Sequence, residues 1–324
     1  MSGLPSYDRL PRREGLACSW ELWRDRAALG SLNLLTCDTR IAAAGEIRRG
    51  VVFSLNSSLA FPGPPLFGRS ALSHEVRADP ESSSQDEVVS EWNTQSSAQW
   101  DGFRHVAREG HGFYGGVDEE EHGVDRWCEA GVVGRAVLAD VDRWRARVGR
   151  PLHQGASDPI FPADLEQTLD WEGVSVRDGD ILLVRTGWTT WYLSLGPGGR
   201  TAIAGAGRLF SPGLAAMEET ARLLWDMHIA AVASDNPALE VWPVDRPTPQ
   251  VVAGAARGGS SSDKGVALHT RLIPMLGIPI GELFDLEGFA LDCAQDMRYT
   301  GFFCSVPLAI PGGVASPPNA VVIK

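Results

Sequence analysis

The clearest structural signal in this 324-residue chain is GDILLVRTGW, residues Gly179–Trp188. After the turn-forming pair Gly179-Asp180, Ile181–Thr186 make an almost unbroken apolar run, which is typical of a strand buried on both faces of a sheet. A second apolar run follows at Ile229–Ala233. Between the two, Leu214–Trp225 carries apolar residues at helical spacing. Because strands and helices alternate, the sequence predicts a mixed α/β fold.

Further elements are predicted on both sides of this centre. Ser211-Pro212 is a typical helix start, since serine caps a helix and proline is tolerated in its first turn. Other helices are expected over Arg40–Arg48, Asp140–Arg147, Pro162–Leu169 and Asp263–Met275. Strands are expected at Val51–Leu55, Gly277–Ile280, Val306–Gly313 (followed by a turn) and Ala320–Ile323. The serine-rich, acidic stretch Ser70–Ser90 is expected to form an exposed loop or a solvated pair of strands.

The chain contains no internal repeat and no low-complexity stretch long enough to link two domains. We therefore expect one domain over residues 1–324. Trp20 and Trp23 lie in the first 50 residues, and their aromatic surface must be covered. Residues 1–50 are accordingly expected to be an N-terminal arm packed on the core.

Charge and cysteine content exclude several classes of protein. There are 41 acidic and 29 basic residues, a formal net charge of −12, and no run of Lys or Arg exceeds two residues. Nucleic acid and anionic membranes are therefore not expected as partners. Five cysteines without a C-x-x-C pair argue against a disulfide framework or a zinc knuckle. With no apolar leader or spanning segment, the sequence predicts a soluble, cytoplasmic protein.

The stretch QSSAQWDGFRH, residues Gln95–His105, carries the strongest functional signal. In an extended chain Gln95, Gln99, Asp101 and His105 all point the same way, whereas on a helix they would scatter. Two interpretations remain open: a polar face of catalytic or metal-binding groups, or a solvated strand face with a chance histidine.

His269 and Glu282 form a second candidate pair, thirteen residues apart with an apolar stretch between them. Their spacing alone fits metal ligands or ordinary surface and helix-end positions. The sequence has no phosphate-binding loop, no dinucleotide-binding fingerprint and no G-x-S-x-G motif. Nucleophilic serine catalysis therefore has no support.

Several segments together resemble the metal-dependent cyclase family that includes bacterial kynurenine formamidase and isatin hydrolase. The resemblance is carried by GDILLVRTGW (179–188), SDNP (234–237), GIPIGEL (277–283) and the closing stretch from Pro307 to Ala320, and NLLT (33–36) resembles the larger members. It implies a swivelling β/α/β fold with a barrel-like mixed sheet and surrounding helices. It also implies a homodimer or homotetramer that acts on a small molecule.

The family's motif H-x-G-T-H-x-D-x-x-x-H can be aligned with residues 95–105. The resemblance then implies that Asp101 binds metal and His105 transfers protons, while Gln95 and Gln99 occupy the positions of two metal-binding histidines. It assigns further metal contacts to His269 and Glu282. The implied cofactor is a divalent ion: Mn, Zn or Mg.

The two glutamines leave three outcomes open. They hold a harder ion such as Mn²⁺ or Mg²⁺, which accepts oxygen ligands; only Asp101, His269 and Glu282 bind an ion; or no ion binds. Retained metal is favoured, because two carboxylates without a cation between them would repel each other.

The expected function is that of a metal-dependent hydrolase or cyclase. Metal-activated water and His105 would open or close a cyclic amide, lactone or related C–N or C–O bond of a small metabolite. The alternatives are a metal-free acid–base cyclase, isomerase or dehydratase, and a non-catalytic binding protein. The expected pocket residues are Trp100, Phe103, Trp188 and Arg104, although core packing is the ordinary role of such aromatic residues and Arg104 could simply pair with acidic surface groups.

Overall fold

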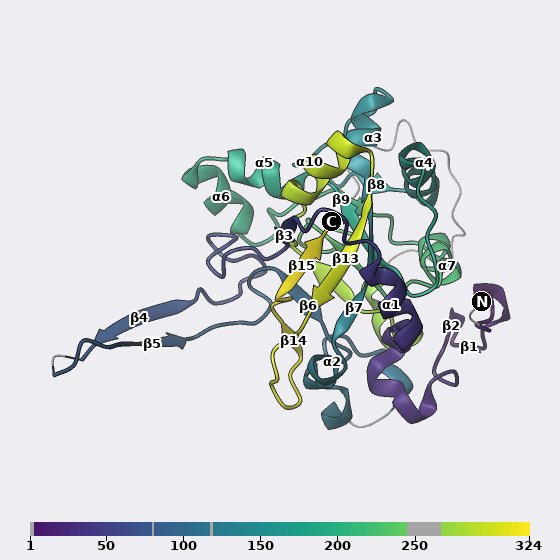
Figure 1. Cartoon of the computed structure of the whole chain (residues 1–324), viewed down its shortest axis with the longest axis horizontal. Helices are drawn as coiled ribbons and strands as arrows, with labels where there is room; N and C mark the ends of the chain where they lie inside the picture. The colour runs from purple at the N-terminus through teal and green to yellow at the C-terminus, as the bar shows by residue number, and fades with distance from the viewer. Residues whose placement is uncertain (1–2, 80, 117–118, 245–266) are drawn as a thin grey trace.

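The computed structural model describes residues 3–79, 81–116, 119–244 and 267–324 (Figure 1). In this part of the chain the main sheet has nine strands in the order β14-β6-β12-β11-β9-β7-β13-β15-β3. Their bounds are β3 Val52–Ser54, β6 Gln99–Asp101, β7 Val132–Asp140, β9 Ile181–Arg185, β11 Ala231–Ser234, β12 Ile280–Glu282, β13 Thr300–Ser305, β14 Ala315–Ser316 and β15 Ala320–Ile323.

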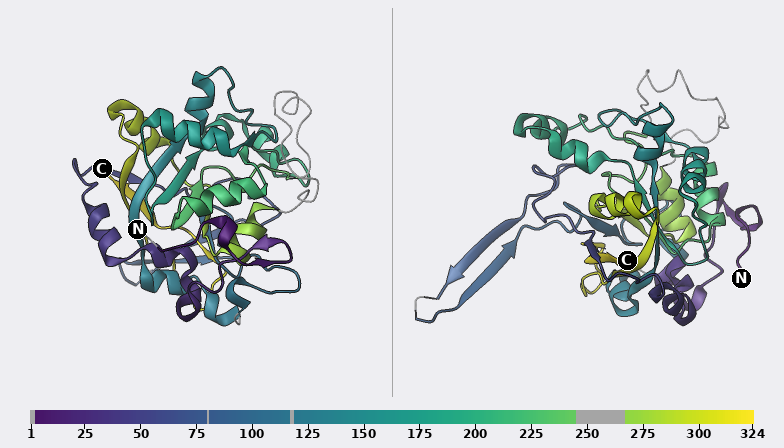
Figure 2. Two further views of the ribbon diagram at one scale, coloured as in Figure 1. Left: turned by 90° about the vertical axis from the view of Figure 1, so that its right-hand side faces the viewer. Right: turned by 45° about the horizontal axis from the view of Figure 1, so that its top comes forward.

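The centre of this sheet is parallel and almost entirely buried. β7, β9, β11 and β12 run parallel as neighbours, and the strands outside them pair antiparallel. All five residues of β9 are buried, as expected for a strand covered on both faces. The sheet curls and helices surround it, as the two views in Figure 2 show. The predicted α/β class with a barrel-like mixed sheet is confirmed.

Helices connect the strands and cover the sheet. The α-helices are α1 Cys37–Ala44, α2 Asp125–Ala130, α3 Val141–Arg147, α4 Pro162–Glu172, α5 Trp188–Ser194, α6 Pro197–Ala204, α7 Glu218–Asp226, α9 Leu268–Arg271 and α10 Glu287–Asp296. Short 3₁₀ turns are η1 Tyr7–Arg9, η2 Arg24–Leu34, η3 Tyr114–Gly116 and η4 Glu119–His122, and η5 Leu272–Leu276 is a π-helical turn.

The helices predicted at Asp140 and Pro162 are confirmed as α3 and α4. Asp164 accepts a hydrogen bond from the Phe161 amide at the start of α4, and Gly173 ends the helix with a φ of 68°. α1 begins three residues before the predicted start, because Thr36 caps it. The helix expected over Asp263–Met275 is α9 followed by η5, and its first residues lie outside the described residues.

The helix predicted to begin at Ser211-Pro212 is wrong at its start. Gly213–Leu214 is instead a strand, β10, which pairs parallel with β8, Pro159–Ile160. Leu214 N donates to Leu239 O at 3.0 Å. The contacts with β8 and Leu239 satisfy backbone groups of Gly213–Leu214 that would otherwise bond within a helix. The helix α7 begins only at Glu218, and its buried stripe of Ala221, Leu224 and Trp225 matches the predicted apolar face.

The strand predicted within Val306–Gly313 is also wrong. β13 precedes this segment, and residues 306–310 have no regular structure. Pro307 and Pro311 lack the N–H that a ladder needs, which explains why pairing ends. The last strand, Ala320–Ile323, is confirmed as β15.

A two-stranded ribbon projects from the body of the molecule (Figures 1 and 2). It consists of β4 (Ser73–Ala78) and β5 (Gln85–Ser90), paired antiparallel. Every residue of β4 is exposed, and so is all of β5 but one. The sequence left a loop or a solvated strand pair open for this segment, and the structure has the strand pair.

The first 50 residues contact the core at several points. They include a small sheet of β1 (Arg12–Arg13) and β2 (Leu16–Ala17). Ser19 N donates to Met275 O at 3.0 Å, and Trp20 Nε1 donates to Pro274 O at 2.6 Å.

All five cysteines are free thiols. In the described part of the chain, no helix combines the length and the apolar character needed to cross a membrane.

Candidate functional site

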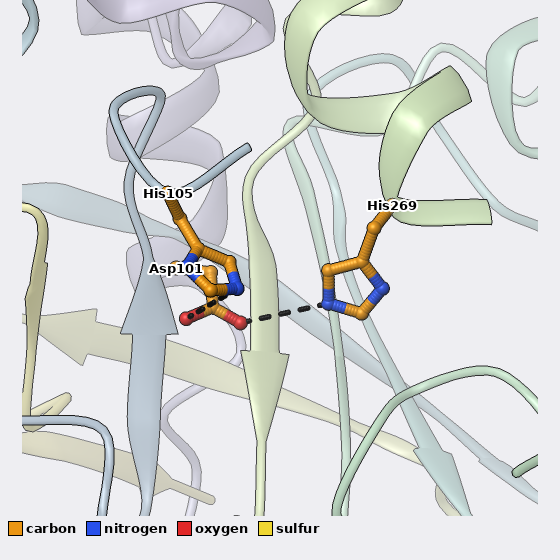
Figure 3. Close-up of side chains that lie close together, drawn as sticks. All are labelled: Asp101, His105 and His269. Carbon is orange, nitrogen blue, oxygen red and sulfur yellow. Dashed lines mark ion pairs between the residues drawn. The ribbon is translucent and has the colours of Figure 1, made fainter. Parts of the chain in front are cut away.

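The candidate site lies where β6 and β12 pair near the edge of the main sheet. Gln99 lies opposite Glu282 in this antiparallel pair, and Asp101 lies opposite Ile280. His269 reaches the same place from α9. Figure 3 shows the imidazoles of His105 and His269 on either side of the Asp101 carboxylate. One ligand atom from each of these three side chains falls within 4.8 Å of the others.

The extended run expected from Gln95 to His105 is wrong in its extent. Only Gln99–Asp101 is a strand, and both Gln95 and His105 lie in turns beside it. The turns nevertheless bring the side chains together. Gln95 Nε2 is 2.6 Å from Asp101 Oδ1 and 3.0 Å from His105 Nδ1. The alternation argument therefore holds for β6, while turn geometry supplies the other two residues.

The Gln99 amide links the two carboxylates of the site. Its Nε2 donates to Glu282 Oε2 at 2.7 Å and, more weakly, to Asp101 Oδ1 at 3.4 Å. Gln99 and Asp101 have no exposed surface, and Glu282 is almost completely buried. The structure thus brings Gln95, Gln99, Asp101 and Glu282 into one hydrogen-bonded group.

His269 is the basic residue at the centre of three carboxylates. Its Nε2 lies 3.2 Å from Glu282 Oε1 and 3.7 Å from Asp101 Oδ2. Its Nδ1 lies 3.2 Å from Glu240 Oε2, and the same oxygen accepts the His269 backbone N–H at 2.9 Å. Glu240 therefore fixes the orientation of the ring. Glu240 was not predicted from the sequence, because a glutamate in ALEVWP (238–243) carries no spacing signal.

Burial and neighbouring charges perturb the acids and bases of this site in opposite directions. Burial opposes ionisation of Asp101, but the imidazoles of His105 and His269 and the Gln95 amide outweigh burial and hold its pKa at about 2. Burial also opposes the charged form of His269, yet Glu240, Asp101 and Glu282 raise its pKa well above the ordinary value. At neutral pH Asp101 is a carboxylate and His269 an imidazolium.

The pKa values of Glu282 and His105 are shifted in opposite directions. Burial, followed by the Asp101 charge, raises the pKa of Glu282 to about 7. Burial lowers the pKa of His105, so its ring is neutral at pH 7. Because the Gln95 amide nitrogen is a donor, His105 Nδ1 accepts and the ring proton resides on Nε2. This nitrogen is 4.0 Å from Asp101 Oδ1.

Two buried oxygens of the site accept no hydrogen bond: Gln99 Oε1, and Asp101 Oδ2, which forms the 3.7 Å ion pair with His269. Buried polar atoms are ordinarily paired, so their pairing requires a group that the protein itself does not supply. Carboxylate, carboxamide and imidazole groups are suitable ligands for a divalent cation such as Mn²⁺. A half-turn of either glutamine amide would exchange its nitrogen for its oxygen. The residues present therefore fit a divalent ion.

A cavity of about 330 Å³ opens onto the site. Its polar lining is Arg69, His105, Glu240, His269, Thr270 and Glu282. Its apolar lining is Phe67, Val106, Pro237, Ala238, Trp242 and Ala267. This size and mixture are typical of a small-molecule site.

The four predicted pocket residues lie elsewhere in the structure. Trp100 points to the opposite side of β6, where its ring lies edge-on to Phe284, 5.0 Å between centroids. Phe103 and Trp188 are also fully buried. Arg104 donates to the Gly312 carbonyl. The aromatic residues have the core role that the sequence left open, whereas the aromatic part of the cavity wall comes from Phe67 and Trp242.

Comparison with known proteins agrees with this fold. The family model described as "Putative cyclase" matches residues 53–241, more than half of the chain. The chain belongs to this cyclase family. No protein of curated function matches it significantly in sequence.

Solved structures similar to this chain include a cyclase and two isatin hydrolases. A crystal structure described as that of a novel cyclase is 29% identical, with a TM-score of 0.78 over 95% of this chain and 99% of that one. Isatin hydrolase A from Labrenzia aggregata, bound to benzyl benzoate, is 18% identical, with a TM-score of 0.54 over 91% and 100%. Isatin hydrolase A from Ralstonia solanacearum is 16% identical, with a TM-score of 0.56 over 89% and 98%. The two hydrolases share the fold.

Proposed function

We propose that this protein is a metal-dependent hydrolase or cyclase that opens or closes a cyclic amide, lactone or related C–N or C–O bond of a small metabolite. The observation that carries the proposal is the convergence of Asp101, His105 and His269 beside two oxygens that accept no hydrogen bond, Asp101 Oδ2 and Gln99 Oε1. His105 and His269 also line the cavity. Membership of the cyclase family and the shared fold of the isatin hydrolases support the same reaction class.

Asp101 and His269 would hold the ion, with Glu282, Gln99 and His105 next to it. A bound divalent ion would supply a polarised carbonyl and a water of lowered pKa. His269 is an imidazolium without the ion, so it must lose a proton to become a ligand. The Glu240 carboxylate keeps the ring oriented in either protonation state.

The chain's own residues provide the proton transfers. Glu282 has a pKa of about 7, so at neutral pH it can take a proton from the attacking water and then return this proton to the leaving nitrogen or oxygen. His105 is neutral, carries its proton on Nε2 and lines the cavity, so it can donate a hydrogen bond to the leaving atom. Ring closure would use the same two groups in reverse.

One observation favours a metal-free acid–base cyclase, isomerase or dehydratase as the second candidate. The Gln99 amide donates to both Asp101 and Glu282, and the His269 imidazolium forms ion pairs with both, so the protein offsets part of their repulsion itself. In this alternative the protonated Glu282 carboxyl acts as the acid and the neutral His105 as the base, without an ion.

A metal titration with matched variants tests the proposal. Chelator-treated protein is loaded separately with Mn²⁺, Zn²⁺ or Mg²⁺, bound metal is measured by mass spectrometry, and ring opening of lactams, imides and lactones is followed by titrating the acid released. We expect Asp101→Asn to lose bound metal and turnover, and Asp142→Asn, a carboxylate outside the site, to keep both. Turnover that survives chelation favours the second candidate. Full metal content and full turnover in Asp101→Asn would contradict the proposed metal site.

A further inference from the structure

Arg69 is a cation built into the wall of the cavity. Its guanidinium lies over the Phe67 ring, 5.1 Å from the centroid, and also donates to the Gln95 carbonyl. Phe67 in turn lies edge-on to Trp242, with the ring planes at 90° and the centroids 5.3 Å apart. The ring and the carbonyl thus hold the guanidinium in place before any ligand arrives. Such preorganisation lowers the entropic cost of binding.

The charges around the cavity give this cation a specific use. The other charged groups of the lining include the carboxylates of Glu240 and Glu282 and the His269 imidazolium, which pairs with both. The whole chain has a net charge of −12. Because His269 is already engaged by these carboxylates, Arg69 is the lining cation that can offset the repulsion of an entering anionic ligand.

The rest of the wall indicates what is attached to the anion. Phe67, Trp242, Val106 and Pro237 supply apolar surface in a cavity of about 330 Å³. That volume is at the small end of ligand sites and suits one ring system. A guanidinium has five N–H donors in a fixed fork, and the Gln95 bond uses one of them. The fork matches the two oxygens of a carboxylate.

We propose that Arg69 binds a carboxylate that the substrate already carries, so that the substrate class is a compact apolar ring bearing a carboxylate separate from the bond that reacts. This inference rests on the proposed function for the identity of the ligand as a substrate. Arg69 acts as a specificity residue; it takes no part in proton transfer.

Binding of a carboxylate probe and its neutral analogue tests the inference. Benzoate and benzamide have nearly the same shape, and their affinities for the chelator-treated, full-length protein can be measured by calorimetry. We expect benzoate to bind at least about tenfold more tightly than benzamide, as for a charge-assisted pair of hydrogen bonds. Arg69→Met should abolish this preference, and Arg69→Lys should keep part of it, because a point charge lacks the fork.

The controls separate recognition from a structural role. Arg77→Met removes an exposed cation of the ribbon, which pairs with Glu75, and should leave the preference intact. A merely structural Arg69 would weaken both probes equally in Arg69→Met and leave their ratio unchanged. Equal affinities in the unaltered protein, binding of neither probe, or a preference that survives Arg69→Met would each overturn the inference.

The outcome is distinguishable from failure of the proposed function. If the protein opens neutral rings but shows no preference for benzoate, the reaction class stands and the carboxylate inference fails. If Arg69 selects benzoate while no ring is opened or closed with any ion, the inference about the ligand stands and the proposed activity fails.

Discussion

Two clusters of acids and bases lie on the same sheet and differ in how their polar atoms are paired. In the Arg185 cluster, Arg185 at the end of β9 bonds Asp140 Oδ1 at 2.7 Å, Asp142 Oδ2 at 3.1 Å and Glu287 Oε1 at 2.8 Å. Next to it, Asp235 accepts three hydrogen bonds from Thr186 and Gly187. One arginine there serves several carboxylates, and each has a donor.

The Asp101 site, made of Asp101, Gln99, His105, His269 and Glu282, uses similar groups but leaves two buried oxygens without a hydrogen bond. Glu282 also lines a cavity, and its pKa is held at about 7. Burial and charge alone therefore do not mark a functional site. The Asp101 site differs because imidazoles and carboxylates converge beside oxygens that keep bonding capacity for a ligand, and because His105, His269 and Glu282 line one cavity.

The largest effect is expected for Glu282→Gln. Turnover should fall at least about 10³-fold, roughly 4 kcal/mol, because the group that accepts the proton is lost. The free energy of unfolding, in contrast, should increase relative to the unaltered protein as the pH rises. The folded pKa of about 7 exceeds the ordinary 4.5, so this carboxyl stabilises the fold below pH 4.5 and that contribution is lost as the pH rises through 7. The amide has no charge to lose, and Gln99 Oε1 is available to accept from it.

Urea unfolding in chelator at pH 5.5 and pH 8, together with turnover, checks this prediction. The variant should gain stability relative to the unaltered protein between the two pH values. Glu75→Gln, on the exposed ribbon, should change neither quantity. A stability gain at pH 5.5 that disappears at pH 8 would reverse the sign and refute the argument.

The next effect concerns the Arg185 cluster. Arg185→Met should lower the free energy of unfolding by about 3 kcal/mol, because it leaves buried carboxylates without their shared cation. Arg143→Met is the matched control: Arg143 also bonds Asp140, but its side chain is 36% exposed, so its loss should cost less than about 1 kcal/mol. Denaturant melts of both variants provide the measurement, and equal losses would mean that the two clusters do not differ as described.

Metal binding should stabilise the protein through the Asp101 site alone. At a Mn²⁺ concentration of about 100 times the dissociation constant, the free energy of unfolding should rise by about 2.7 kcal/mol. Asp101→Asn should lose this increase and Asp142→Asn should retain it, as followed by thermal melts with and without the ion. An equal increase in both variants would place the ion elsewhere.

The smallest effect is expected for Glu172→Gln, next to the Arg185 cluster. Glu172 Oε1 accepts the Asp140 backbone N–H at 2.8 Å, but Oε2 is unpaired, as in the Asp101 site. Burial raises the pKa of Glu172 to about 9, so its stabilising, protonated form is lost as the pH rises from 4.5 through 9.

The amide should therefore be more stable than the acid at pH 8 by at least about 1 kcal/mol, the equivalent of one pKa unit. Unfolding at pH 5 and pH 8 measures the difference. Glu166→Gln, on the exposed side of the same helix, is the control and should show no pH-dependent gain. No gain in Glu172→Gln at pH 8 would mean that this carboxyl is not held neutral.

Much of the fold could be predicted because burial leaves a direct trace in the sequence. The five residues of β9 are apolar or, at Arg185, ion-paired, and the stripe of α7 repeats at helical spacing. The helix start predicted at Ser211-Pro212 was wrong because the local preference of this pair is weaker than the pairing of Gly213–Leu214 with β8. Capping is a local effect, whereas pairing with a strand fifty residues away depends on the assembled fold.

The candidate site could be predicted only where side chains come from one short segment or from the family motif. Alternation along β6 placed Gln99 and Asp101 together, and the resemblance added His269 and Glu282. Glu240 and Arg69 could not be found this way, because each reaches the cavity from a loop whose position depends on packing elsewhere. Trp100 was expected in the pocket, but its position between Gln99 and Asp101 places it on the opposite face of the strand.

The projecting ribbon of β4 and β5 has a practical consequence for handling the protein. Its two strands bond mainly to each other, in a register that runs from Ser73 opposite Ser90 to Ala78 opposite Gln85. Residues 81–84 at its tip are exposed. An epitope or a fluorophore grafted there would lengthen a hairpin without entering the nine-stranded sheet, so the molecule could be anchored to a sensor surface with its cavity still accessible.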